Sequence, residues 1–161
     1  MGLDMYLSVR KYVNRIDYNS VQSGGEPEIR QEFQNVVNVL DVENLIEKDS
    51  WTGMSVDVPV GYWRKANAIH AWIVNNCANG VDECQPIYVS PDKASELLKS
   101  CQDVVEYPEF AKELLPPQSG FFFGSTDVDE YYINDLKYTI QVLTKVLSAK
   151  NVDSVIYQAS W

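Results

Sequence analysis

The sequence predicts an α+β domain in which a small, mostly antiparallel sheet of about four or five strands is packed with three or four main helices. Three observations favour this class. Short alternating segments typical of strands occur near both ends and in the middle of the chain. Longer segments with apolar residues at helical spacing lie between them. With 161 residues, 45% of them hydrophobic, the chain is expected to form a single domain over residues 1–161.

The first half of the chain is expected to hold two strands and three helices. Residues 5–12 alternate and predict a strand with Met5, Leu7 and Val9 on one face. Pro27 is expected to open a helix, and a short helix is expected over 42–48. Alternating valines predict a strand over 56–60, followed directly by a helix over 62–74. The apolar positions of the Pro27 helix are Ile29, Phe33, Val36, Val37 and Leu40.

The second half is expected to alternate strands and helices. Residues 87–89 predict a short strand, after which Ser90 and Pro91 are typical of a helix start. Residues 108–115 can form two helical turns. The very apolar Gly120–Ser125 segment, with three consecutive phenylalanines, predicts a central strand covered on both faces.

The C-terminal part is expected to contain the longest helix and a closing strand. Asp127 is expected to cap this helix, and Asn151 to end it. Residues 153–161 predict a strand that returns to the sheet. The core positions of the helix are Ile133, Leu136, Ile140, Leu143 and Leu147. The acidic residues near its start, Asp127, Asp129 and Glu130, could bind Mg²⁺, although such residues more often cap a helix.

All the histidine and cysteine of the chain lies within 32 positions, as His70, Cys77, Cys84 and Cys101. Together they form a Cys₃His set, the composition of a closed, structural zinc site. Their spacings of seven, seven and seventeen residues include no C-x₂-C pair, so the set is not a standard motif. Two ligands of one ion cannot lie seven residues apart on a helix, so the helix over 62–74 is expected to end near residue 75 or 76. The sequence therefore predicts zinc bound by these four residues.

Other interpretations of the same residues stay open. Three buried, reduced thiols and one core histidine would have the same composition. A disulfide between Cys84 and Cys101 is a second alternative. A cysteine brought beside His70 would form a nucleophile pair, which is a third.

The charge of the chain restricts its partners. A formal net charge of −10 argues against direct binding of nucleic acid or of an anionic membrane surface. It suits a soluble protein, a partner with a positively charged groove, or a mimic of nucleic acid. The sequence has no apolar run of 18 residues, no visible signal peptide, and no phosphate-binding or nucleophile-elbow motif.

Several segments resemble, in the same order, a family of small proteins encoded by phages and prophages. They are MGLDMYL, GYWRKANAIHAWIV, GVDEC, LLPPQSGFFFGSTDVDEYYINDL and the closing SW. The resemblance implies that the positions of His70, Cys84 and Cys101 recur in the family, whereas that of Cys77 is often apolar. It implies no reaction, because no general reaction is assigned to the family.

In its size, its negative charge and its resemblance to phage proteins, the chain is similar to anti-CRISPR proteins. Some of these proteins occupy the basic channel of a Cas9-type effector. The expected function is therefore a non-enzymatic inhibitor in the host cytoplasm that blocks nucleic-acid loading onto such an effector, with zinc in a structural role. The alternatives are a phage metabolic enzyme that uses a metal or a Cys–His pair, and a virion accessory protein.

Overall fold

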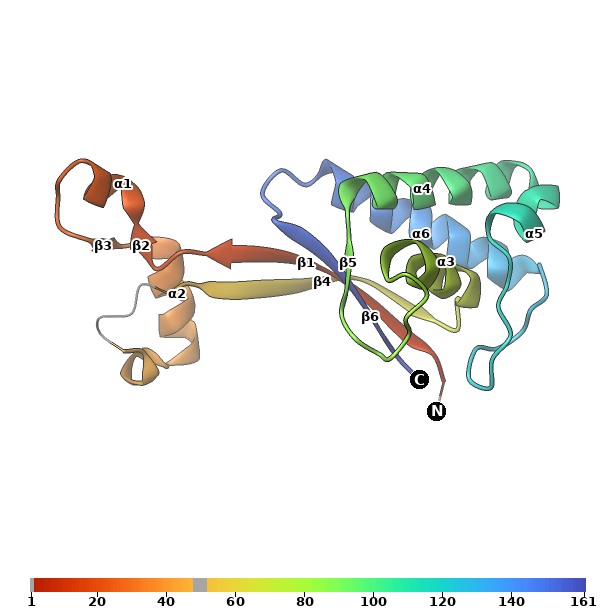
Figure 1. Cartoon of the computed structure of the whole chain (residues 1–161), viewed down its shortest axis with the longest axis horizontal. Helices are drawn as coiled ribbons and strands as arrows, with labels where there is room; N and C mark the ends of the chain where they lie inside the picture. The colour runs from red at the N-terminus through yellow and green to blue at the C-terminus, as the bar shows by residue number, and fades with distance from the viewer. Residues whose placement is uncertain (1, 48–51) are drawn as a thin grey trace. The chain divides into compact units, whose positions relative to one another are not determined.

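The computed structural model describes residues 2–47 and 52–161, which divide into two compact units (Figure 1). The larger unit is formed by Met1–Arg10 and Val58–Trp161, and the smaller unit by Lys11–Asp57. Two long strands, β1 (Asp4–Val13) and β4 (Met54–Arg64), contribute residues to both units. The single domain expected over residues 1–161 stays a prediction.

The larger unit is built on an antiparallel sheet with the strand order β4-β1-β6-β5. Strand β6 (Ser154–Ser160) lies at the centre, beside β1. It pairs with β1 from Asp4↔Ser160 to Arg10↔Ser154, and with β5 (Ile87–Val89) on its other side. The strands predicted over 5–12, 56–60, 87–89 and 153–161 are confirmed.

Helices cover one face of this sheet (Figure 1). They are α3 (Asn67–Cys77), α4 (Pro91–Glu106), α5 (Ala111–Leu114) and α6 (Glu130–Ser148), and the 3₁₀ turn η2 (Pro108–Phe110) links α4 to α5. Helices α4 and α6 pack against each other. As predicted, Ser90 caps α4, and its hydroxyl accepts a hydrogen bond from the Lys93 N–H at 3.2 Å. No helix within the described residues is long and apolar enough to cross a membrane.

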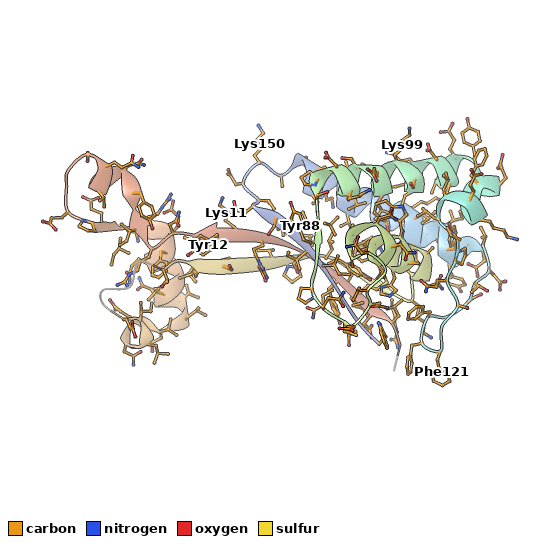
Figure 2. All side chains as sticks on the ribbon, viewed as in Figure 1. Lys11, Tyr12, Tyr88, Lys99, Phe121 and Lys150 are labelled. Atoms are coloured by element: carbon orange, nitrogen blue, oxygen red, sulfur yellow. The ribbon has the colours of Figure 1, made fainter. Side chains whose placement is uncertain are left out.

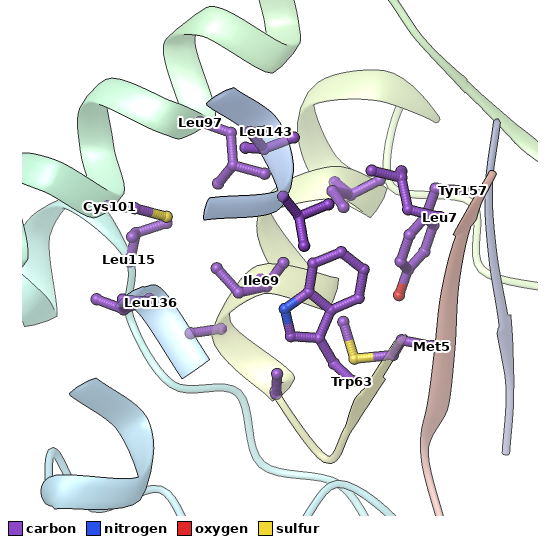
Figure 3. Packing of buried hydrophobic residues seen from close by; sticks show 14 of the residues in the cluster. Met5, Leu7, Trp63, Ile69, Leu97, Cys101, Leu115, Leu136, Leu143 and Tyr157 are labelled. Atoms are coloured by element: carbon purple, nitrogen blue, oxygen red, sulfur yellow. The ribbon is translucent and has the colours of Figure 1, made fainter. Parts of the chain in front are cut away.

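The hydrophobic core lies between the sheet and these helices. Alternate residues of β1, including Met5 and Leu7, point toward the helices, as do Val155 and Tyr157 of β6. Figure 3 shows Met5, Leu7 and Tyr157 on the side of Trp63, the α3 residue Ile69, and leucines of α4 and α6. The inward alternation that the sequence predicts for Met5 and Leu7 is confirmed.

The smaller unit has a two-stranded sheet of β2 (Ile16–Asp17) and β3 (Glu28–Ile29). Its helices are α1 (Tyr18–Gln22) and α2 (Gln31–Leu40), followed by a 3₁₀ turn, η1 (Glu43–Leu45). Ile16, Phe33 and Val37 are buried within it. The two units together confirm the α+β class.

Two predictions for the smaller unit are wrong in detail. The helix expected to open at Pro27 begins at Gln31, because Glu28 and Ile29 pair with β2 instead. Ile29, expected on the apolar helix face, is 48% exposed. The short helix expected over 42–48 is the three-residue turn η1, and residue 48 lies outside the described residues.

The helix predicted over 62–74 begins later and ends later than expected. Residues 62–64 continue β4, with Trp63 buried and Tyr62 exposed in strict alternation. Lys65 then adopts a left-handed backbone with φ 63°, which ends the strand before α3 starts. The end predicted near residue 75 or 76 is also wrong, because α3 continues to Cys77.

The central strand predicted at Gly120–Ser125 does not form. This segment makes a turn, in which Phe121 is 96% exposed while Phe123 packs on the core. Figure 2 shows Phe121 at the edge of the larger unit, directed away from it. A buried strand would cover all three phenylalanine rings, whereas here Phe121 is exposed, Phe122 is partly buried and Phe123 packs on the core.

The predicted N-cap of the last long helix lies two positions before the observed one. Asp129, not Asp127, is the N-cap of α6, and its carboxylate accepts from the Tyr132 N–H at 3.0 Å. Asp127 instead accepts a hydrogen bond from the Ser125 hydroxyl at 2.9 Å. The core positions predicted for α6 are confirmed: Leu136 and Leu143 are buried, and Ile133, Ile140 and Leu147 are partly buried against the same core.

Candidate functional site

His70 is buried in α3, with only 1% of its surface exposed, and both of its ring nitrogens have partners. Nδ1 lies 2.7 Å from the hydroxyl of Tyr157 on β6, and Nε2 lies 3.0 Å from Oδ2 of Asp82. An ionised Asp82 can only accept, so in the neutral imidazole Nε2 carries the hydrogen and Tyr157 donates to Nδ1. We call these three residues the His70 lock, because they join α3, the following loop and the last strand.

The surroundings of the His70 lock support this assignment. Tyr157 is fully buried, and burial raises the pKa of its hydroxyl, so the hydroxyl stays protonated and able to donate. The ring of Phe123 packs edge-on against His70 at a centroid distance of 5.2 Å. The indole N–H of Trp161 donates to Oδ1 of Asp82 at 3.4 Å. The lock therefore holds the C-terminal end of the chain to the loop after α3.

The three cysteines are free thiols in different settings. Cys77 is the half-buried last residue of α3, and Cys84 lies half-buried in the following loop with φ 57°. Cys101 is fully buried in α4, among Leu97, Leu115 and Leu136 in Figure 3. Burial raises the pKa of Cys101 to about 12 and also raises that of Cys77. Both thiols therefore stay protonated near neutral pH while no metal ion is bound, and a bound zinc ion would displace these protons.

The residues predicted to bind zinc are not brought together as a ligand set. Among residues 2–47 and 52–161, no three His, Cys, Asp or Glu side chains form a group that could hold a metal ion. To bind zinc, His70 would have to release Tyr157 or Asp82 from one ring nitrogen. No hydrogen bond in the described chain joins His70 to a cysteine, so the arrangement does not favour the nucleophile pair either. The zinc site at His70, Cys77, Cys84 and Cys101 stays a prediction.

Metal removal distinguishes the His70 lock from a zinc site. Because hydrogen bonds account for both ring nitrogens, we expect a chelator to leave the melting temperature of the purified protein unchanged. The measurement is thermal unfolding with and without the chelator, together with metal content by mass spectrometry. One zinc per chain and a lower melting temperature after chelation would instead support the Cys₃His site.

A second feature is a group of exposed side chains on the segment from the end of α4 through η2 to α5. It consists of Glu106, Tyr107, Glu109, Phe110 and Glu113, which we call the acidic-aromatic surface. All five side chains are exposed. The rings of Tyr107 and Phe110 pack edge to face at 6.1 Å. Within the described chain, none of the three carboxylates forms an ion pair, so their charge is available to a partner.

A cavity of about 230 Å³ lies between the turn from β4 to α3 and the first turns of α6. Asn67, at the start of α3, fixes one of its walls. Its amide nitrogen donates to the carbonyls of Phe123 at 3.0 Å and Ser125 at 2.8 Å, and its amide oxygen accepts from the Gln118 N–H at 3.0 Å. These bonds hold the loop that carries Gly124 and Ser125 against the cavity.

The sequence does not predict which residues are hydrogen-bonded to His70 or that Asn67 holds the wall of the cavity. Asp82 falls in the loop predicted after α3, but only the sheet pairing brings Tyr157 to His70. A buried asparagine such as Asn67 has no distinguishing spacing, so its role appears only in three dimensions. The chain matches no family model, no curated protein and no solved structure in the three comparisons made.

Proposed function

We propose that this protein acts by binding a positively charged surface of another protein through its acidic-aromatic surface. The observation that carries the proposal is that one short segment exposes three carboxylates without ion pairs and two packed aromatic rings. Tyrosine and phenylalanine supply rigid contact area at the centre of interfaces, and surrounding charges steer and orient the partner. A net charge of −10 gives the whole chain the same sign as this surface.

The partner that this surface suits is a protein with a basic nucleic-acid channel. Exposed carboxylates can meet lysine and arginine side chains that otherwise contact phosphates. The family resemblance makes a Cas9-type effector in the host cytoplasm the specific proposal, with the chain blocking guide or target loading. Direct binding of nucleic acid or of a membrane is not part of this function.

The backbone of this surface is well supported, so it can present its side chains without ordering on binding. Helix α4 packs along α6 and contacts η2, and α5 contacts both η2 and α4. The hydroxyl of Tyr132 on α6 donates to the carbonyl of Leu115, just after α5, at 2.8 Å. A preformed surface avoids much of the entropy loss of binding, which favours a role in recognition.

Neutralising the carboxylates should weaken binding. We expect Glu106→Gln/Glu109→Gln/Glu113→Gln to reduce affinity for a purified Cas9-type effector by at least about tenfold, because charge-assisted contacts are lost. The measurement is the equilibrium affinity at several salt concentrations, with effector free, guide-loaded and target-bound. Affinity of the wild type should fall steeply with salt, and the variant should show a shallower slope.

A matched control removes the same charge elsewhere. Glu26→Gln/Glu28→Gln/Glu32→Gln also loses three exposed carboxylates, but from the smaller unit. It should retain most of the affinity if the acidic-aromatic surface makes the contact. Equal losses in both variants would indicate non-specific attraction, and binding that does not depend on salt would contradict the proposal.

A further inference from the structure

The cavity beside Asn67 has a positively charged side. Arg64 and Lys65 line it from the turn between β4 and α3. Within the described residues, neither side chain makes a hydrogen bond or ion pair. Helix α3 starts at the same place without a side-chain cap, because its N-cap residue is Ala66. Its first-turn N–H groups, like the two cations, favour a negatively charged group.

Three carboxylates also line the cavity. Asp127, Asp129 and Asp135 line it from α6 and the loop before it. Asp129 and Asp127 already accept hydrogen bonds from the chain. The carboxylate of Asp135 is half-buried and has no hydrogen bond or ion pair to any described residue. Burial, with a smaller effect of the neighbouring Asp129, raises the pKa of Asp135 to about 6, as expected for an acid that lacks a positive partner.

These opposite charges do not neutralise each other. No ion pair joins Arg64 or Lys65 to any of the three aspartates in the part of the chain that the structure describes. The aspartates also do not form a group suited to a metal ion there. A ligand with one charge of each sign would satisfy both sides, and an organic ammonium suits the acidic side better than a divalent cation does.

We propose that this cavity binds a small zwitterion of the amino-acid class. Its carboxylate would lie against Arg64, Lys65 and the uncapped start of α3, and its ammonium group against Asp135. The volume of about 230 Å³ is below the range typical of pockets for drug-sized ligands, which favours a ligand as small as an amino acid. This site goes beyond the protein-binding function proposed above and does not depend on it.

The test compares three related ligands on the purified full chain. A thermal-shift screen of the common α-amino acids selects the ligand that stabilises most, and calorimetry measures its affinity. The decarboxylated amine and the deaminated acid of that same amino acid are then measured. We expect each of these one-charge analogues to bind at least about tenfold more weakly, because one charge-assisted contact is lost.

Variants assign the binding to this cavity. Asp135→Asn and Arg64→Gln should each weaken binding at least about tenfold, whereas Glu83→Gln, an exposed acid outside the cavity, should not change it. Circular dichroism confirms that each variant is folded. The proposal is overturned if no amino acid stabilises the chain at about 10 mM, or if both cavity variants bind normally. Inorganic phosphate binding as tightly as the best amino acid would also overturn it, since that would indicate an anion site only.

Discussion

Replacing His70 with alanine should lower the free energy of unfolding by about 3–5 kcal/mol, because a buried ring and two hydrogen bonds are lost together. The hydroxyl of Tyr157 and one oxygen of Asp82 would lose their partner. The ring of Phe123 would face the space left by the imidazole. For a chain of 161 residues, this loss corresponds to a melting temperature lower by roughly 10 °C.

Tyr157→Phe separates the hydrogen bond from the packing of the His70 lock. It removes one hydroxyl and should cost about 1–2 kcal/mol, since Nδ1 of His70 loses its donor. The double variant His70→Ala/Tyr157→Phe should be less destabilised than the sum of the single variants, by about 0.5 kcal/mol or more. Denaturant unfolding of all four proteins measures this coupling.

The exposed Gln102→Ala on α4 is a suitable control and should change stability by less than about 0.5 kcal/mol. A loss of under about 1 kcal/mol for His70→Ala would show that the lock contributes little. Fully additive single variants would show that His70 and Tyr157 do not act as a pair.

Replacing Asn67 with alanine should cost about 2–4 kcal/mol, because three hydrogen bonds between its amide and the backbone are lost at once. The two carbonyls and one N–H that it satisfies belong to residues 118–125, which have no regular secondary structure. The effect should therefore be largest in this loop. Amide hydrogen exchange of residues 118–125 should rise before that of the helices.

Asn67→Asp gives a sharper test of the same bonds. Aspartate keeps the acceptor for the Gln118 N–H but places a carboxylate beside two carbonyl oxygens. At neutral pH it should be at least as destabilising as alanine, although it is closer to asparagine in shape. Asn134→Ala, at an exposed position of α6, is the matched control and should leave stability nearly unchanged. An aspartate variant as stable as the wild type would contradict the role assigned to the amide nitrogen.

Most elements could be predicted where local pattern and capping agree. The N-cap at Ser90 with Pro91 behind it, the alternation around Met5 and the last strand all follow from short-range preferences. The prediction that a helix begins at residue 62 is wrong, because the apolar residues there suit both a strand and a helix. Trp63 is buried in the strand conformation, and its indole N–H donates to the Thr139 hydroxyl at 2.9 Å, which favours the strand there.

The candidate sites could be predicted only in part. His70 stood out as the single histidine of the chain, and the acidic character was evident from its composition. The partners of His70 are Tyr157 and Asp82, which lie 87 and 12 residues away and carry no motif that links them to it. The opposite charges around the cavity come from segments about sixty residues apart, so no local pattern joins them.

The sequence by itself determined the α+β class, the negative charge and most helix and strand positions, because these depend on composition and on neighbours a few residues apart. Only the tertiary structure decided which side chains meet. It paired β6 with β1 and β5, placed Tyr157 against His70, and brought Asp135 and two cations to the lining of one cavity. Such contacts depend on strand register and helix packing between distant segments, which short-range preferences do not specify.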